Sequence, residues 1–297
     1  MLSLSSRATA DPERIRLERV EHDDAARSFR ITVSSRVGEP LGYWLQVGDA
    51  KDAPHGVILP ALGQAASYRV EAELATTNWG DVTFLRLEAN LSRSNAGPLG
   101  DAARLWERYR TADVAEAISG IDLGALRDTV RGKQQSPLAA TVAALVLLRA
   151  NRLELISDWL GDLADWFPQL PDGAVLWAEQ RMRQQSDRAL AVSEAAASLC
   201  RLDERGLPFT SEAMSYAASL AARLGRVAHL VPDAVRERFD RVCERIAEAL
   251  VYFRPGGLFA AYAGFDADTA ANLMLPAKKM VEGSGALPTG ADQARNR

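Results

Sequence analysis

The side chains that could support nucleophilic catalysis are few and lie far apart in the sequence. The histidines are His22, His55 and His229, and the cysteines are Cys200 and Cys243. A nucleophilic Ser, Cys or Thr needs an adjacent base, but no histidine lies beside a promising nucleophile and no GxSxG motif occurs. Both cysteines fall on apolar stripes of expected helices, a position typical of inert buried thiols. We therefore predict no catalytic residue, while a site assembled only in three dimensions stays open.

A row of acidic residues offers a second kind of chemistry, the binding of a hard metal ion. The row comprises Glu154, Asp158, Asp162 and Asp165, which share one face of an expected helix over residues 153–167. Oxygen ligands suit such ions, but metal sites usually need ligands from a second element as well. The opposite face of this helix is apolar, so a solvated acidic face is the simpler interpretation. We predict no metal ligand, and without a Walker or GxGxxG motif we predict no cofactor.

The best candidate for binding is an aromatic residue in an expected loop. Trp79 lies between Asn78 and Gly80, in a segment that separates two expected strands. Exposed loop aromatics often anchor protein contacts, and packing against the edge of a sheet is the competing interpretation. We predict partner contact for Trp79 and Asn78, with Trp44 as a further candidate.

The first third of the chain has the two-residue period of β-strands. Apolar and polar residues alternate over residues 29–33, 68–74 and 85–91. Such alternation is typical of strands with one buried face. Short strands that are separated by turn residues, with no helix among them, predict an antiparallel β-sandwich.

The composition changes at residues 92–100, where the stretch SRSNAGPLG has the polar, Gly- and Pro-containing character of a linker. After it, apolar residues recur with the period of helices, and Gly and Pro separate the helices. We predict an α+β protein in which a β-sandwich is followed by an all-α domain. The expected parts are a flexible N-terminus at 1–13, the β-sandwich domain at 14–95, the helical domain at 100–282 and a disordered tail at 283–297.

Several motifs in the helical part resemble those of a known group of proteins. They are Ser136-Pro137 at the start of an apolar helix, the pair Asp158-Trp159, the turn Phe167-Pro168-x-Leu170-Pro171-Asp172-Gly173, and Arg205-Gly206-Leu207-Pro208. Over residues 136–208 the chain resembles a helical region of poorly characterised bacterial proteins that are encoded beside, or fused to, caspase-like peptidases in conflict systems. The resemblance implies a role beside a peptidase. The caspase-type His-Gly and Cys motifs are absent, so the chain would not be the peptidase itself.

Composition narrows the classes of function. The net charge of −4 does not favour nucleic-acid binding, which depends on basic groups that face phosphates. The longest apolar run is too short for a membrane span, and the first residues do not form a signal peptide. Two cysteines without metal-ligand spacing fit a reducing cytoplasm.

These observations together predict a non-enzymatic protein-binding or regulatory subunit in the bacterial cytoplasm. The candidate partner is another protein, namely a caspase-like peptidase that is encoded nearby in an antiviral defence system. The main alternative is a hydrolase whose site assembles only in three dimensions. A nucleic-acid-sensing module that gathers arginines on one face is a third, weaker option.

Overall fold

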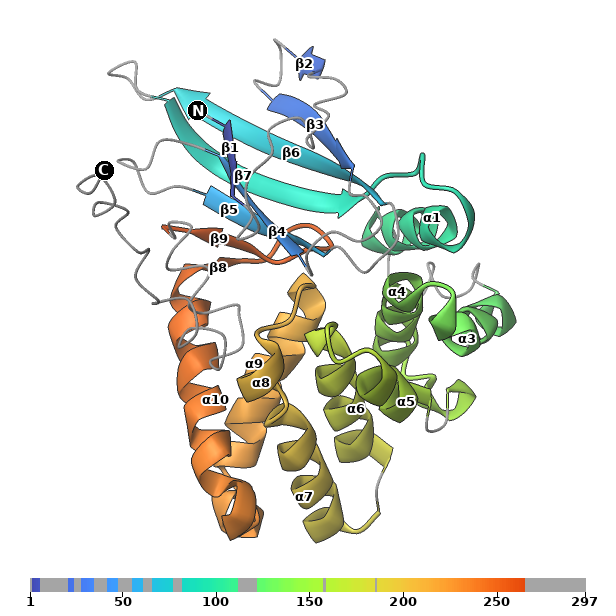
Figure 1. Ribbon diagram of the computed structural model, residues 1–297, viewed down its shortest axis with the longest axis vertical. Coiled ribbons are helices and arrows are strands. Elements are labelled where there is room, and N and C mark those ends of the chain that lie inside the picture. Colours follow the sequence, from blue (N-terminus) through green and yellow to red (C-terminus); the bar gives the residue numbers. More distant parts are fainter. Residues whose placement is uncertain are drawn as a thin grey trace, which may run out of the picture.

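The structure, a computed structural model, is a mixed α+β protein with antiparallel sheets at one end and helices at the other (Figure 1). It describes residues 2–5, 21–23, 28–34, 42–47, 55–60, 66–76, 82–111, 122–156, 159–184 and 186–264. The predicted order of sheets first and helices afterwards is confirmed at this level. The expected tail at 283–297 lies outside the described residues.

Two antiparallel sheets form the first part of the molecule. Their strands are β1 (Leu2–Ser5), β2 (Glu21–Asp23), β3 (Ser28–Ser34), β4 (Gly42–Val47), β5 (His55–Pro60), β6 (Ser67–Thr76), β7 (Val82–Leu91), β8 (Phe253–Arg254) and β9 (Ala261–Ala263). The five-stranded sheet has the order β1-β4-β5-β9-β8, and the four-stranded sheet has the order β2-β3-β6-β7. In β6 the side chains of Tyr68, Val70 and Ala72 are fully buried, as the two-residue period predicts. Leu2–Ser5 pairs with β4, although this range was expected to be flexible.

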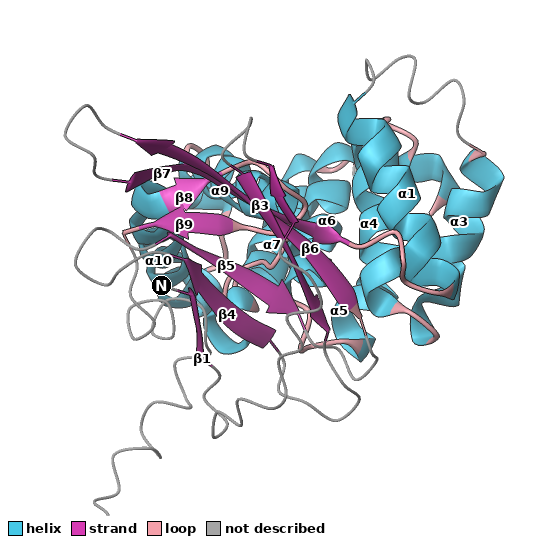
Figure 2. Ribbon diagram, turned by 90° about the horizontal axis from the view of Figure 1, so that it is seen from above, coloured by secondary structure: helices cyan, strands magenta, loops and turns pink. Residues whose placement is uncertain are grey.

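The last described part of the chain returns to the N-terminal sheets. β9 pairs antiparallel with β5, where Val57 lies opposite Ala261, and β8 follows at the edge of the same sheet (Figure 2). The sequence predicts a helical domain over 100–282, so these two strands were not expected there. The run of residues 258–262 is apolar without alternation, and all of these residues are buried. A strand covered on both faces has this pattern.

The helical region is built around one buried helix. Its helices are α1 (Gly97–Thr111), α3 (Leu123–Arg131), α4 (Pro137–Arg149), α5 (Trp159–Trp166), α6 (Pro171–Gln184), α7 (Arg188–Leu199), α8 (Leu202–Arg205), α9 (Ser211–Gly225) and α10 (Asp233–Tyr252), with the 3-10 turns η2 (Gly132–Gln134), η3 (Leu153–Leu155) and η4 (Ala228–Leu230). In α4 every residue from Pro137 to Leu148 is buried. The Ser136 hydroxyl accepts from Ala139 N and caps this helix, and Pro137 occupies its first turn, as predicted.

One predicted helix is two elements in the structure. Residues 153–167 were expected to form a continuous helix, but they include η3 and, after two residues that are not described, α5. Leu153, Ile156 and Leu160 are all buried. The buried residues therefore recur with a helical period although the backbone forms a 3-10 turn and then an α-helix. Periodicity alone does not distinguish one continuous helix from two shorter helical elements.

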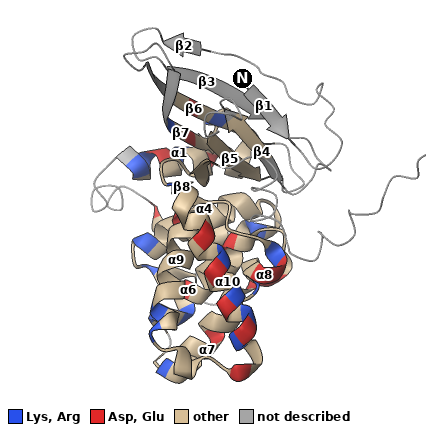
Figure 3. Ribbon diagram, turned by 90° about the vertical axis from the view of Figure 1, so that its left-hand side faces the viewer, with Lys and Arg blue, Asp and Glu red and all other residues tan. Residues whose placement is uncertain are grey.

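Charged residues of both signs are mixed on the helices. On the side shown in Figure 3, Lys and Arg alternate with Asp and Glu along α8 and α10. Arg241 of α10, for example, pairs with Glu237 on its own helix and with Asp203 of α8. Within the described residues, no helix is both long enough and apolar enough to cross a membrane.

Candidate ligand-binding cleft

The three histidines lie on three separate elements. His22 is in β2, His55 is in β5 and His229 is in η4. Burial is the main cause that lowers the pKa of His55, and the charge of Arg254 lowers it further. No two of the histidines share a strand or a helix.

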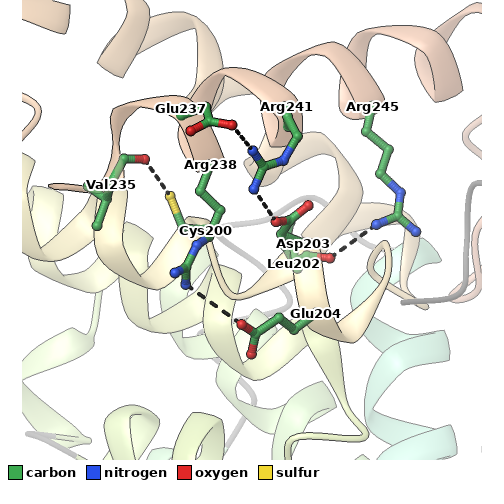
Figure 4. A network of polar contacts seen from close by, with 9 residues as sticks. All are labelled: Cys200, Leu202, Asp203, Glu204, Val235, Glu237, Arg238, Arg241 and Arg245. Atoms are coloured by element: carbon green, nitrogen blue, oxygen red, sulfur yellow. Dashed lines mark hydrogen bonds and ion pairs between the residues drawn. The ribbon is translucent and has the colours of Figure 1, made fainter. Parts of the chain in front are cut away.

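The two cysteines lie near the packed surface between α8 and α10. The Sγ atom of Cys200 is 3.7 Å from the carbonyl oxygen of Val235 (Figure 4). Burial raises the pKa of both Cys200 and Cys243 to about 11, so both remain protonated thiols near neutral pH. Their environment is therefore that of inert thiols. Around them, ion pairs join Arg241 to Asp203 and Glu237, and Arg238 to Glu204, while Arg245 donates to the carbonyl oxygen of Leu202 (Figure 4).

The acidic row of the sequence does not converge in the structure. Glu154 lies in η3, Asp162 and Asp165 lie in α5, and Asp158 lies outside the described residues. Each described carboxylate has its own basic partner: Arg152 for Glu154, Lys133 for Asp162 and Arg201 for Asp165. Among the residues that the structure describes, no group of His, Cys, Asp and Glu is arranged to hold a metal ion.

The predicted partner-contact residues are only partly within the described chain. Trp79 and Asn78 lie outside it, so partner contact at these residues stays a prediction. Trp44 of β4 is 8% exposed, and its ring occupies the space that a side chain at Gly56 would need. Its ring centroid lies 6.1 Å from that of Tyr262 in β9. Trp44 thus packs within the five-stranded sheet, and its role in partner contact stays untested.

Two motifs that are far apart in the sequence meet at a buried carboxylate. Asp172, in the first turn of α6, is fully buried and accepts from Phe209 N and Thr210 N, each at 2.9 Å, and from Thr210 Oγ1 at 2.6 Å. Burial raises the pKa of Asp172, and these hydrogen bonds oppose the rise. The same Thr210 hydroxyl accepts from Ala213 N and caps α9. Asp172 therefore holds the start of α9 in place.

The segment before α9 also joins the helices to the sheets. Ser211 N donates to Leu258 O at 2.9 Å, and Ala260 N donates to Phe209 O at 2.8 Å. Leu258 N in turn donates to Asn90 Oδ1 in β7 at 2.8 Å. We call residues 207–211, 257–260 and 89–90 the seam.

Glycine is required at one position of the seam. A Cβ atom on Gly257 would lie 2.5 Å from the carbonyl oxygen of Ala89 and 2.8 Å from its nitrogen. Because both neighbours are backbone atoms of β7, a side chain could be accommodated only by moving the strand or the segment. The close approach lets Phe259 N donate to Ala89 O at 3.0 Å.

A cleft of about 550 Å³ lies beside the seam. Its walls come from α1, the end of α4, the start of α9 and the turn at residues 255–257. The aromatic lining residues are Trp106, Tyr109 and Tyr216, and the charged ones are Arg110, Arg149 and Glu212. A volume of this size is in the range of small-ligand sites, which run from about 300 to 1,000 Å³.

Ion pairs and an aromatic contact order the charged side chains of the cleft. Arg149, the last residue of α4, pairs with Glu212 of α9, and its guanidinium lies 4.8 Å from the centroid of the Tyr109 ring. Arg110 Nη1 lies 2.8 Å from Oε2 of Glu88 in β7. The Glu212 side chain is 16% exposed, and burial raises its pKa against the opposing effect of Arg149.

Several buried polar atoms of the cleft residues are unsatisfied. Within the described residues, Trp106 Nε1, Tyr109 Oη and Glu212 Oε2 have no hydrogen-bond partner. A buried donor or acceptor without a partner costs about 1–3 kcal/mol, and such groups are rare in folded proteins. These three atoms belong to side chains that line the cleft, and others of the kind lie elsewhere in the described chain.

The cleft residues were not singled out from the sequence. One signal was available, because Trp106, Tyr109 and Arg110 have the i, i+3, i+4 spacing of one helix face. The same spacing is typical of any packed helix face, so it does not identify a site. Arg149 and Glu212 come from other helices, and their pairing depends on the fold.

The comparisons with known proteins place the chain in a family. The family model described as the Y4kD C-terminal domain matches residues 107–282. The matched range begins within α1 and includes the cleft residues Tyr109, Arg110, Arg149 and Glu212. No curated protein and no solved structure matched the chain. The link to caspase-like peptidases stays a prediction. By the match over residues 107–282, the chain belongs to the Y4kD C-terminal domain family.

Proposed function

We propose that the chain is a non-enzymatic regulatory subunit that binds a segment of a protein partner in the cleft. The observation that carries the proposal is the cleft itself, whose lining combines Trp106, Tyr109 and Glu212 with two arginines. Trp, Tyr and Arg are the residue types most enriched at the energetic centres of protein interfaces, and Arg110 and Arg149 complete the lining. The volume of about 550 Å³ leaves room for a few residues of an extended segment.

The finer parts of the proposal rest on the sequence. The resemblance over residues 136–208 supports a caspase-like peptidase, encoded nearby in a bacterial antiviral defence system, as the partner. Cys200 and Cys243 are free thiols, which is compatible with the reducing cytoplasm. We further propose that the two sheets form a β-sandwich, and the contacts of β7 with β5 and β9 support this.

Co-purification tests the proposal directly. The full chain is tagged, co-expressed with the products of its neighbouring genes, and compared with the variants Arg149→Ala and Arg152→Ala. The two arginines lie near the end of α4 and each pairs with one glutamate, but only Arg149 lines the cleft. We expect wild type and Arg152→Ala to retain a partner and Arg149→Ala to lose it, with circular dichroism confirming the fold of all three. If wild type retains no neighbour, the proposal loses its main support.

The other candidate functions gain no support from these observations. The hydrolase with a site assembled in three dimensions stays a prediction, and His22, His55 and His229 lie on β2, β5 and η4. For a nucleic-acid sensor, basic residues would gather on one face, whereas Figure 3 shows acidic and basic residues mixed along the helices on that side.

A further inference from the structure

We infer that the group recognised in the cleft is an oxyanion, either a carboxylate or a phosphate carried by the ligand. The inference rests on the proposed function, because it assigns the chemistry of the ligand to the same cleft. It is carried by the hydrogen-bond donors and the charges of the lining residues, which are taken in turn below.

Charged donors outnumber charged acceptors in the lining, because Arg110 and Arg149 accompany one carboxylate, that of Glu212. The indole N–H of Trp106 can only donate, and the hydroxyl of Tyr109 can donate or accept. A guanidinium carries five N–H donors, and Arg110 and Arg149 each hold their carboxylate partner through Nη1. The remaining N–H groups of both arginines extend the set of donors. An oxyanion is the group that accepts from several such donors at once.

The local charge also favours an anion. Glu88 is shared by Arg86 and Arg110, and Glu212 pairs with Arg149. Among the residues that line the cleft, Arg110 and Arg149 are basic and Glu212 is acidic, so the lining carries one more basic than acidic group. The side chains of Arg110 and Arg149 are 31% and 47% exposed, so both guanidinium groups are open to a group bound in the cleft.

The opposite assignment, an amine that binds Glu212, explains less. It would provide a partner for Glu212 Oε2 but not for Trp106 Nε1, because an ammonium group has no acceptor. It would also add a positive charge beside Arg149 and Arg110. An oxyanion can instead accept from Arg110 and share Arg149 with Glu212, as carboxylates around one guanidinium do.

The aromatic residues accommodate the rest of the ligand. The ring centroids of Trp106 and Tyr109 lie 5.6 Å apart with an interplanar angle of 40°. Arg149 covers the Tyr109 ring, so a group that binds this guanidinium is placed next to an apolar surface. The cleft therefore suits an oxyanion that is attached to a larger body.

Isothermal titration calorimetry on the full chain, with inorganic phosphate and the peptide hexaglutamate as separate probes, tests the inference. We expect at least one probe to bind wild type at millimolar concentrations or below, and Arg149→Gln to weaken binding about tenfold or more. Arg152→Gln, which changes an arginine outside the cleft, should bind like wild type. Binding of hexaglutamate alone assigns the oxyanion to a protein carboxylate, and binding of phosphate alone assigns it to a phosphorylated ligand.

A second variant protects the test against misfolding. Arg110→Gln removes the other guanidinium without disturbing the pair of Arg149 and Glu212, and it should weaken binding of the same probe, with circular dichroism showing that the variant is folded. The inference is overturned if neither probe binds wild type, or if Arg152→Gln loses as much affinity as Arg149→Gln. Retention of a protein partner without any probe binding would leave the proposed function in place and remove the oxyanion. Probe binding without retention of a protein partner would support the oxyanion site and remove the proposed function.

Discussion

The start of α9 separates two carboxylates, those of Asp172 and Glu212, that have opposite surroundings. On the side of α6, Asp172 is fully buried and accepts three hydrogen bonds from Phe209 and Thr210. On the side of α4, Glu212 has one oxygen paired with Arg149 and a second oxygen with no partner among the described residues. Burial raises the pKa of both carboxyl groups.

The difference shows how a structural acid can be distinguished from a candidate binding acid. Both are removed from water, and a perturbed pKa alone would rank them together. The hydrogen bonds of Asp172 are all used to hold the seam, so nothing is left for a ligand. Glu212, in contrast, has one carboxylate oxygen with no partner among the described residues. Trp106 and Tyr109, which line the same cleft, also have unpartnered atoms. Three comparisons of variants test this division, and a fourth tests the seam that Asp172 holds.

The largest effect is expected from Asp172→Ala. The change leaves the N–H groups of Phe209 and Thr210 and the Thr210 hydroxyl without their acceptor in a dry interior. We expect the free energy of unfolding to fall by about 2–4 kcal/mol, measured by urea denaturation. Asp165→Ala, which removes an exposed partner of Arg201, is the control, with a loss of about 0–1 kcal/mol. Equal losses in the two variants would contradict the structural role of Asp172.

Gly257→Ala is expected to have the next largest effect. The added methyl group would overlap with the backbone of Ala89, so either the segment or β7 has to move. Overpacking of this kind costs about 1–3 kcal/mol. The thermal midpoint should fall clearly, whereas Gly225→Ala, at a position where a Cβ atom meets nothing within 4 Å, should leave it almost unchanged or raise it.

Removing one hydroxyl near Asp172 and one near Glu212 is expected to change the free energy of unfolding by a smaller amount. Thr210→Val removes a donor to Asp172 and the cap of Ala213 N, so we expect a loss of about 1–2 kcal/mol in urea denaturation. Tyr109→Phe removes a hydroxyl that has no partner among the described residues, so its stability should equal or exceed that of wild type. A Tyr109→Phe variant that is destabilised as strongly as Thr210→Val would show that the Tyr109 hydroxyl is satisfied within the chain.

The smallest effect is the pH dependence that Glu212 contributes. Since its pKa is raised in the folded chain, the folded state binds the proton more tightly than the unfolded state does. The stability of wild type relative to Glu212→Gln should therefore increase as the pH is lowered from 7, and level off below the ordinary value of 4.5. Urea denaturation of both proteins at several pH values measures the difference. A difference that decreases on acidification would mean that Arg149 outweighs burial.

Much of the local structure follows from the sequence, because local patterns determine it. The alternation around Tyr68 and Val70 predicts the strand that became β6, and Ser136-Pro137 predicts the start of α4. In each case, the signal comes from residues that are neighbours in the sequence and bury one face or cap one end.

The cleft and the seam could not be predicted in the same way. Glu212 and Arg149 are ordinary surface residue types in helices, and nothing near either of them in the sequence indicates the other. Phe259 and Ala89 belong to segments whose approach depends on the whole helical region that lies between them. Only the spacing of Trp106 and Tyr109 was visible, and without the partners it indicates a packed helix.

The seam also sets the order in which the molecule can be completed during synthesis. Leu258 and Asn90, which it joins, are 168 positions apart. Contacts over such a separation form slowly, because the intervening chain loses much of its freedom before they are made. On the ribosome, β5 emerges long before its neighbour β9. The edge of β5 that pairs with β9 therefore stays unpaired until the described helices have been translated. An unpaired strand edge is prone to aggregation, so the nascent chain is exposed to this risk during that time.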